Sequence, residues 1–308
     1  MITIYKKGET CLETLSQATS GCWLNVVDPT AAEIAQLQQM LSVPQDWITY
    51  PLDLDERARI EKENGFTMIV LRVPRFQGES SDIPYTTVPL GMVATDGYIV
   101  TVCKIESDVT QELLRARALS TAKRNRFILR LLFIMANRYL THLRTINKAV
   151  DQLEDQLQLS LRNSELLELL KYEKSLVYFT TALKSNELIL RHLEKGQLFQ
   201  QYPEDMDLLE DVVTEVRQAI EMTDISSSIL RQMVDTFASI ISNNLNAVMK
   251  FMAAVTIILS FPTIIASLYG MNVGLPLQNS PWAFLMVVLV ALFACATVLV
   301  VFWKKDWL

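Results

Sequence analysis

The chain has 308 residues, with 28 Lys and Arg against 34 Asp and Glu, and a net charge of −6 at pH 7. Hydrophobic residues make up 50% of it, and no charged residue occurs between Lys250 and Lys304. An acidic chain lacks the basic stripe with which proteins bind nucleic acid, so we expect no nucleic-acid partner. The composition predicts a charged, acidic body followed by an apolar tail.

Common enzyme motifs are absent from the sequence, which contains no glycine-rich phosphate loop, no HExxH and no GxSxG. The acids Asp53, Asp55 and Glu56 are expected in the charged start of a helix, where carboxylates are usually solvated. The four cysteines form no CxxC pair, which argues against a zinc ribbon or a disulfide framework. An enzyme is therefore the least expected class, and we expect no organic cofactor.

Residues 1–120 carry mixed strand and helix signals, which predict an α/β domain. Asp28-Pro29-Thr30 followed by AAEIAQLQQML is typical of a strand end, an N-cap and an amphipathic helix. Asp96-Gly97 between two apolar runs indicates a two-residue hairpin, and residues 74–87 are expected to form a loop. Runs rich in β-branched and aromatic residues predict strands at Ile2–Tyr5, Trp23–Val27, Thr67–Val73, Val88–Ala94 and Tyr98–Cys103.

From about residue 121 glycine and proline almost vanish, which predicts long helices. We expect these helices at about 121–160, 163–196 and 204–270. The first two would form an intermediate antiparallel pair within 121–203, and the third would supply a stalk over 204–250. No glycine or proline interrupts Glu204–Phe261, a stretch about 87 Å long as a helix.

Two apolar segments, Phe251–Tyr269 and Ala283–Trp303, are each about 20 residues long, enough to cross a hydrocarbon core of ~30 Å. The flanking lysines place both termini in the cytoplasm by the positive-inside tendency, so we expect a multi-pass protein of the cell (inner) membrane, partnered with the lipid bilayer. The expected parts are a first transmembrane helix at 251–270, an extracytoplasmic loop at 271–282, a second transmembrane helix at 283–303 and a basic cytoplasmic C-terminus at 304–308.

The third long helix has two faces of different chemistry. Steps of three and four residues, typical of a packing seam, mark an apolar face at Leu208, Val212, Val216, Ile220, Thr223, Leu230, Val234, Phe237, Ile241, Leu245 and Val248. A second, small and polar face continues into the membrane at Met252, Thr256, Ser260, Thr263, Ser267 and Gly270.

A polar face inside a membrane requires water, a partner or a pathway, although serine and threonine also bond to their own helix or join neighbouring helices. The spacing of this face is compatible with both pore lining and plain packing. One hairpin cannot enclose a pore, so pore lining would require a closed ring of identical subunits. The expected fold class is an α+β membrane protein with an N-terminal cytoplasmic α/β domain, a long helical stalk and two C-terminal transmembrane helices per subunit.

The first span ends in Tyr269-Gly270-Met271-Asn272, and the second span is followed by KKDWL. A GMN triplet at the outer end of the first of two C-terminal spans resembles the signature of the CorA family of magnesium and cobalt transporters. NNLNAVMK at Asn243–Lys250 resembles that family's segment before the membrane, and LDLDERARIE at Leu52–Glu61 resembles part of its N-terminal domain. The resemblance implies a homopentameric divalent-cation channel whose stalk helix becomes the pore-lining span.

The resemblance also implies roles for individual residues. Regulatory Mg²⁺ would be held between subunits by Asp211, with Glu79 and Asp82 as candidate partners. A hydrophobic gate would be formed by Met249 and Met252, although flexible methionines also simply fill gaps. The pore and its selective mouth would be formed by Gly270, Met271, Asn272, Thr263, Asn246 and Asp235.

Mg²⁺ gives up its water shell reluctantly, so a ring of asparagine amides at the mouth would present neutral acceptors to a hydrated ion. Gly270 is expected to let the backbone turn at the helix end. The sequence also departs from the family, because Val273–Trp282 carries no acid and Ser260 stands where relatives have a methionine ring.

The sequence is compatible with three functions. The transported ion would be Mg²⁺, with Co²⁺ or Ni²⁺ not distinguished from it. A zinc transporter of the ZntB type, from the same superfamily, is a second reading, although the polar face offers none of the His or Cys ligands that zinc prefers. A membrane-anchored oligomeric scaffold or sensor would carry no ion at all.

Overall fold

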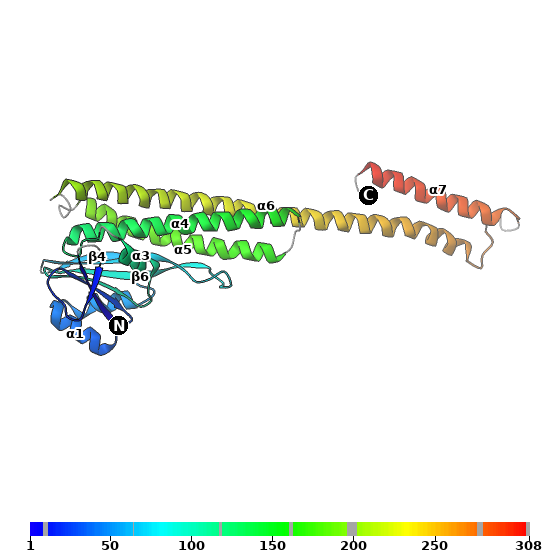
Figure 1. Ribbon diagram of the computed structural model, residues 1–308. Helices are drawn as coiled ribbons and strands as arrows, with labels where there is room; N and C mark the ends of the chain where they lie inside the picture. The colour runs from blue at the N-terminus through cyan, green and yellow to red at the C-terminus, as the bar shows by residue number, and fades with distance from the viewer. Residues whose placement is uncertain are drawn as a thin grey trace. The chain divides into compact units, whose positions relative to one another are not determined.

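A computed structural model of the chain describes residues 1–8, 12–63, 65–116, 119–159, 163–195, 202–275 and 280–305 (Figure 1). The chain divides into two compact units, Met1–Val234 and Asp235–Leu308, and one helix, α6 (Pro203–Tyr269), runs through the boundary between them.

The first unit is built on a seven-stranded sheet in the order β2-β1-β3-β7-β6-β5-β4. The central pair β3 and β7 is parallel, and the other neighbouring strands are antiparallel. The strands are β1 Ile2–Lys7, β2 Leu12–Leu15, β3 Cys22–Val27, β4 Arg59–Glu63, β5 Phe66–Phe76, β6 Tyr85–Ala94 and β7 Tyr98–Cys103.

Helices cover both faces of this sheet, which is why its central strands are apolar at nearly every position. One face packs against α1 (Ala31–Leu41) and α2 (Gln45–Thr49), through a cluster that includes Leu24, Leu41 and Trp47. The other face packs against α4 (Arg124–Leu159) and α5 (Asn163–Lys195), and Figure 1 shows these two helices on the side opposite α1.

All five predicted strands are present, and most are longer than expected. The predicted loop at 74–87 was wrong at both ends. β5 continues to Phe76 and β6 begins at Tyr85, because Pro74 pairs with Thr87 and the Phe76 and Tyr85 rings stack 5.0 Å apart. The Asp96-Gly97 hairpin is confirmed, since Thr95 N–H donates to the Tyr98 carbonyl at 3.0 Å.

The helix expected at Asp53, Asp55 and Glu56 was also wrong. This segment follows a single 3-10 turn at Tyr50–Leu52 and leads into β4. The Arg72 guanidinium from β5 donates to the carbonyls of Leu54 at 2.6 Å and Glu56 at 3.0 Å, and these bonds fix the segment in a non-helical form. Sequence analysis also missed β2, β4, α2 and α3 (Asp108–Arg115).

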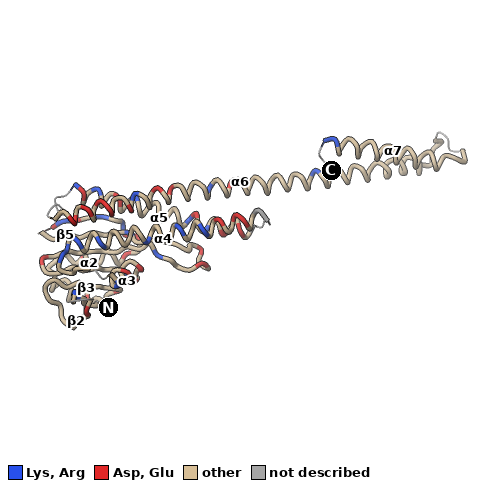
Figure 2. The backbone as a smooth tube through the Cα atoms, turned by 45° about the horizontal axis from the view of Figure 1, so that its top comes forward, with Lys and Arg blue, Asp and Glu red and all other residues tan. Residues whose placement is uncertain are grey.

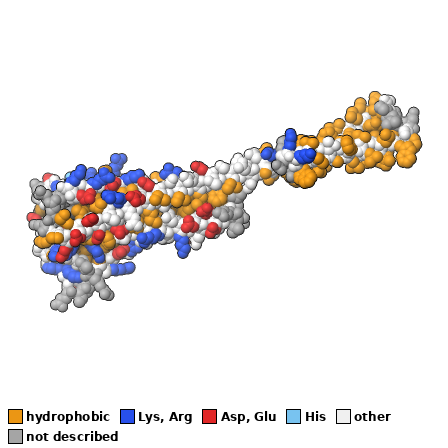
Figure 3. Space-filling model, turned by 90° about the horizontal axis from the view of Figure 1, so that it is seen from above, with side chains coloured by type: hydrophobic (Ala, Val, Ile, Leu, Met, Phe, Trp, Pro, Cys, Tyr) orange, Lys and Arg blue, Asp and Glu red, His pale blue; other side chains and the backbone are white. Residues whose placement is uncertain are grey.

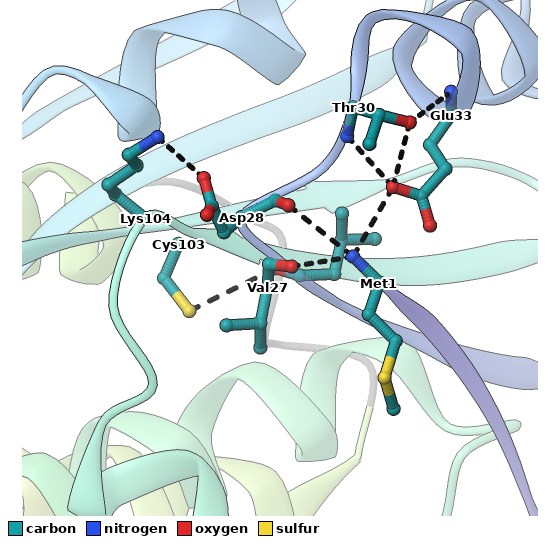
Figure 4. Close-up of polar contacts among 8 residues, drawn as sticks. Met1, Val27, Asp28, Thr30, Glu33, Cys103 and Lys104 are labelled. Carbon is teal, nitrogen blue, oxygen red and sulfur yellow. Dashed lines mark hydrogen bonds and ion pairs between the residues drawn. The ribbon is translucent and has the colours of Figure 1, made fainter.

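The predicted cap of α1 is confirmed as a capping box (Figure 4). Thr30 N–H donates to a Glu33 carboxylate oxygen at 2.8 Å, and Glu33 N–H donates to the Thr30 hydroxyl at 3.3 Å. Asp28, just before the cap, adopts a φ of 43° and contacts Lys104 at 2.5 Å. The turn from β3 into α1 is therefore stabilised by the capping box at the start of α1 and by the ion pair between Asp28 and Lys104 just before it.

The three long helices expected after residue 121 are confirmed as α4, α5 and α6. Within the first unit, α6 buries the apolar face that the sequence predicted, including Val212, Val216, Thr223 and Leu230. Ion pairs join α5 to α6 at Lys184–Asp224 (3.5 Å) and Glu173–Arg231 (3.8 Å). These two pairs show which levels of the antiparallel helices lie side by side.

Candidate ion pathway

The second unit contains two helices that are long and apolar enough to cross a membrane, the end of α6 and α7 (Ala283–Lys304). No charged residue lies between Lys250 and Lys304, so the hairpin is uncharged along its length (Figure 2), and hydrophobic side chains make up most of the face of it that Figure 3 shows. Many of these side chains are exposed, for example Phe284 at 82% and Phe293 at 76%. Such an uncovered apolar surface suits contact with lipid or with other copies of the hairpin.

The two helices pack through one face of α6, which we call the packing face: Ala254, Ile258, Phe261 and Ile265. Ala254 is fully buried, and the other three are partly buried. The Cys295 thiol of α7 lies 3.5 Å from the Ile258 carbonyl oxygen. Ala254 is the fully buried member of this face, and small residues are common where membrane helices pack together.

The polar face of α6 points away from α7. Its members within the span are Met252, Thr256, Ser260, Thr263 and Ser267, and all five are exposed. At 3.6 residues per turn these positions lie about half a turn from the packing face. The hairpin therefore forms without covering its polar face.

The hydroxyls on this face donate their protons back into the helix. Thr256 donates to the Met252 carbonyl at 2.8 Å, Ser260 to the Thr256 carbonyl at 2.7 Å and Thr263 to the Leu259 carbonyl at 3.1 Å. A hydroxyl whose proton is used in this way still has lone pairs to accept from water. The face thus presents hydrogen-bond acceptors, which are what the waters of a hydrated cation require.

The GMN triplet follows directly where α6 ends at Tyr269. Gly270 N–H donates to the Ala266 carbonyl at 2.9 Å, and the Asn272 side chain is exposed. The expected turn of the backbone at the helix end is present, since α6 stops at Tyr269 and Gly270 lies in a turn, although its φ is not positive. A Cβ at this position would lie 3.3 Å from the Ala266 carbonyl oxygen, so glycine serves here by leaving a crowded space empty.

The remaining pathway candidates lie on α6 before the span. Met249 and Met252 are 61% and 58% exposed, one turn apart, and Asn246 and Asp235 are exposed as well. None of these side chains is engaged in a core. They are available for contact with other copies of the chain or with ions.

Asp211 is separated from Glu79 and Asp82 within the first unit. Burial raises the pKa of the Tyr172 phenol on α5, and the nearby Glu79 carboxylate raises it further. Tyr172 is next to Glu173, which pairs with Arg231 on α6, some 20 residues beyond Asp211. That is about 30 Å along the helix.

Among the residues that the structure describes, no group of three or more His, Cys, Asp or Glu side chains is placed to hold a metal ion. The predicted regulatory acids are therefore not assembled into a site within one chain.

Sequence reasoning missed the packing face, which requires knowing which side of α6 meets α7. The only local signals were the small residue Ala254 and the single thiol Cys295, and neither specifies its partner.

A sheet domain, a helical body and an uncharged two-helix hairpin define a membrane protein whose second span closes back on its first. The family model described as "CorA-like Mg2+ transporter protein" matches residues 19–305. The chain therefore belongs to the CorA family, whose members are membrane transporters of divalent cations.

Two relatives are both named cobalt/magnesium transport protein CorA. The one from Methanocaldococcus jannaschii is 27% identical over 296 residues, covering 93% of this chain and 91% of the relative. The one from Thermotoga maritima is 24% identical over 305 residues, covering 93% and 83%. The solved complete structure of the M. jannaschii CorA magnesium transporter matches 100% of this chain and 99% of its own, with a TM-score of 0.86 at 23% identity.

Proposed function

We propose that this protein is a divalent-cation channel in which a homopentameric ring of subunits surrounds a pore lined by the polar face of α6. The observation that carries the proposal is the opposition of the two faces of α6: α7 packs against one, and acceptor groups occupy the other. In a ring, α6 would lie inside and α7 outside, with the acceptors turned to the axis. The ring would sit in the cell (inner) membrane with both termini in the cytoplasm.

Mg²⁺ is the ion we favour, because the acceptors are neutral oxygens suited to an ion that keeps its water shell. Both named relatives are described as cobalt/magnesium transport proteins, so Co²⁺ is the next candidate. At the outer mouth, the exposed amide of Asn272 would accept hydrogen bonds from the ion's waters. At the inner edge, rings of Met249 and Met252 would close the path by excluding water.

Cytosolic Mg²⁺ would regulate the ring by neutralising carboxylates between subunits, so that a fall in Mg²⁺ lets like charges repel. A rotation about an axis along α6 leaves each residue at its own height along that axis. Glu79 lies near Tyr172 and Asp82 near Lys171 on α5, at a level about 30 Å along α6 from Asp211. These acids would accordingly hold separate ions at two levels rather than share one. Asp211→Ala should weaken inhibition by internal Mg²⁺.

The test is Mg²⁺ uptake into liposomes that contain the full-length protein and an entrapped indicator. We expect flux through the native protein and a loss of at least tenfold in Asn272→Ala. Val273→Ala, a truncation at the next residue, which is also exposed, should keep native flux.

The same vesicles distinguish the alternatives. Zinc flux without magnesium flux would identify a zinc transporter of the ZntB type. If folded and oligomeric protein carried neither ion, a scaffold or sensor would be the remaining candidate function. Flux that is unchanged in Asn272→Ala would remove the asparagine from the mouth while leaving a channel.

A further inference from the structure

An apolar groove runs along one flank of the helical body, between α4 and α6. Its volume is about 510 Å³, and Val150, Met222, Ile225 and Ile229 line it. Ile225 and Ile229 are 60% and 52% exposed, an unusual state for isoleucines in the middle of a packed helix. The rim carries Asp151 and Glu221, so the groove is an apolar floor between carboxylates.

The outward face of α5 has the opposite character. We call it the α5 ridge, and its residues recur at steps of three and four: Leu170, Lys174, Val177, Thr181, Lys184 and Leu188. Val177 and Leu188 are 53% and 68% exposed. The ridge combines exposed aliphatic side chains with lysines and contains no acid. Its chemistry is complementary to that of the groove.

The groove and the ridge lie at the same level of the body. Lys184 on the ridge pairs with Asp224, and Asp224 is next to Ile225 of the groove. Glu173, next to Lys174, pairs with Arg231, two residues beyond Ile229. A rotation about an axis along α6 does not change the height of any residue along that axis. The ridge of one copy can therefore meet the groove of the next copy without a shift along the axis.

We infer that the α5 ridge of each subunit seats in the α4–α6 groove of its neighbour, which makes the body's subunit interface heterologous. Two different faces of one chain then meet head to tail, and such contacts close into a ring when the rotation permits. Apolar contacts form the centre, and Lys174 faces Asp151 and Glu221 at the edge, while Lys184 stays paired with Asp224 of its own chain. This inference rests on the ring of the proposed function and identifies the surfaces that build it.

Cross-linking of the full-length protein in membranes tests the pairing. Thr181→Cys on the ridge and Ile225→Cys in the groove lie at matching levels, and both positions are exposed. With a short bismaleimide, the double variant should give a ladder of covalent oligomers up to the closed ring. Each single variant measures any cross-linking through the native cysteines and should give no ladder of the double variant's strength, because identical positions do not meet across a heterologous contact.

The control pair joins Thr181→Cys with Arg217→Cys, an exposed position on the flank of α6 that faces α5 of the same chain. It should give no ladder. A ladder of equal strength from the control pair, or none from Thr181→Cys with Ile225→Cys in protein of oligomeric mass, would overturn the inference and leave the channel proposal standing. A monomeric mass would overturn both.

A pair of charge reversals tests the same contact between ridge and groove without introducing a cysteine. Lys174→Glu sets like charges against the acidic rim, so the oligomer should dissociate on dilution at several-fold higher concentration than the native ring. Adding Asp151→Lys should restore the native value. Failure of the second change to restore it would contradict the contact between ridge and rim.

Discussion

The side chain of Asn186 on α5 takes the place of a strand beside Arg72 on β5. Its amide oxygen accepts from the Arg72 N–H at 2.9 Å, and its amide nitrogen donates to the Arg72 carbonyl at 2.7 Å. β4 pairs with β5 only as far as Val70, so this edge of β5 would otherwise be unpaired. One helix side chain thus fixes α5 to the sheet.

Asn186→Ala should destabilise the protein by about 2 kcal/mol, because it leaves the part-buried Arg72 N–H without a partner. The Arg72 carbonyl would keep its bond from the Tyr139 hydroxyl at 2.9 Å, which limits the loss. Denaturant unfolding of the full-length protein in detergent measures the effect. The control is Asn137→Ala, whose amide bonds within its own helix to Phe133 and should cost much less. Equal losses would contradict the account.

Gly91 on β6 is required by the close approach of Pro51. A Cβ at position 91 would lie 2.1 Å from the Pro51 Cγ, a clash that the rigid ring cannot relieve. Gly91→Ala should therefore cost about 1–3 kcal/mol, as overpacked cores do. Gly97→Ala, where a Cβ meets nothing within 4 Å, is the control in the same thermal melts. Adding Pro51→Ala should recover part of the loss, and no recovery would count against this contact.

His142 should make the protein less stable in mild acid. Burial lowers its pKa below the ordinary 6.5, Asp108 at 3.9 Å opposes the shift and Arg138 adds to it. The unfolded chain then binds a proton more readily than the folded one, so stability is full above pH 6.5 and falls as the pH drops below it. Unfolding between pH 7.5 and 5.5 should be less pH-dependent in His142→Gln than in the native protein. Identical slopes would refute the assignment.

Met252→Ser should raise Mg²⁺ flux several-fold when internal Mg²⁺ is high, because a polar ring wets a constriction that apolar side chains keep dry. Met286 on α7 provides the matched control, as an exposed methionine on the other helix of the hairpin. Met286→Ser should leave flux unchanged in the same liposomes. A gate elsewhere would be indicated if Met252→Ser also behaved as native.

Local signals predicted much of this fold. The strands, the three long helices and the two spans each follow from periodicity or composition within one segment, and all are present. The failures involve contacts between distant segments. β4 reads Arg-Ile-Glu-Lys-Glu, so it lacks the apolar run of an interior strand, and the segment before it is held by Arg72 from another strand.

In the candidate pathway too, local relations were predicted and contacts between distant segments were not. The spacing of Thr256, Ser260 and Thr263 predicted one shared face, because a helix fixes that relation locally. Which face of α6 packs on α7 depends on contacts such as that between Ile258 and Cys295, which are 37 residues apart in the chain. The spacing of residues within α6 carries no information about such contacts.

The most direct test of the central claim compares two threonines that make the same hydrogen bond to their own helix. One lies on α6 and the other on α7. Thr263 donates to Leu259 on the polar face of α6, and Thr297 donates to Phe293 on α7 in the same way. Valine removes the hydroxyl and keeps the shape. We predict that Thr263→Val lowers Mg²⁺ flux in liposomes several-fold while Thr297→Val leaves it at the native value. Equal flux in the two variants would contradict a pore lined by the polar face of α6.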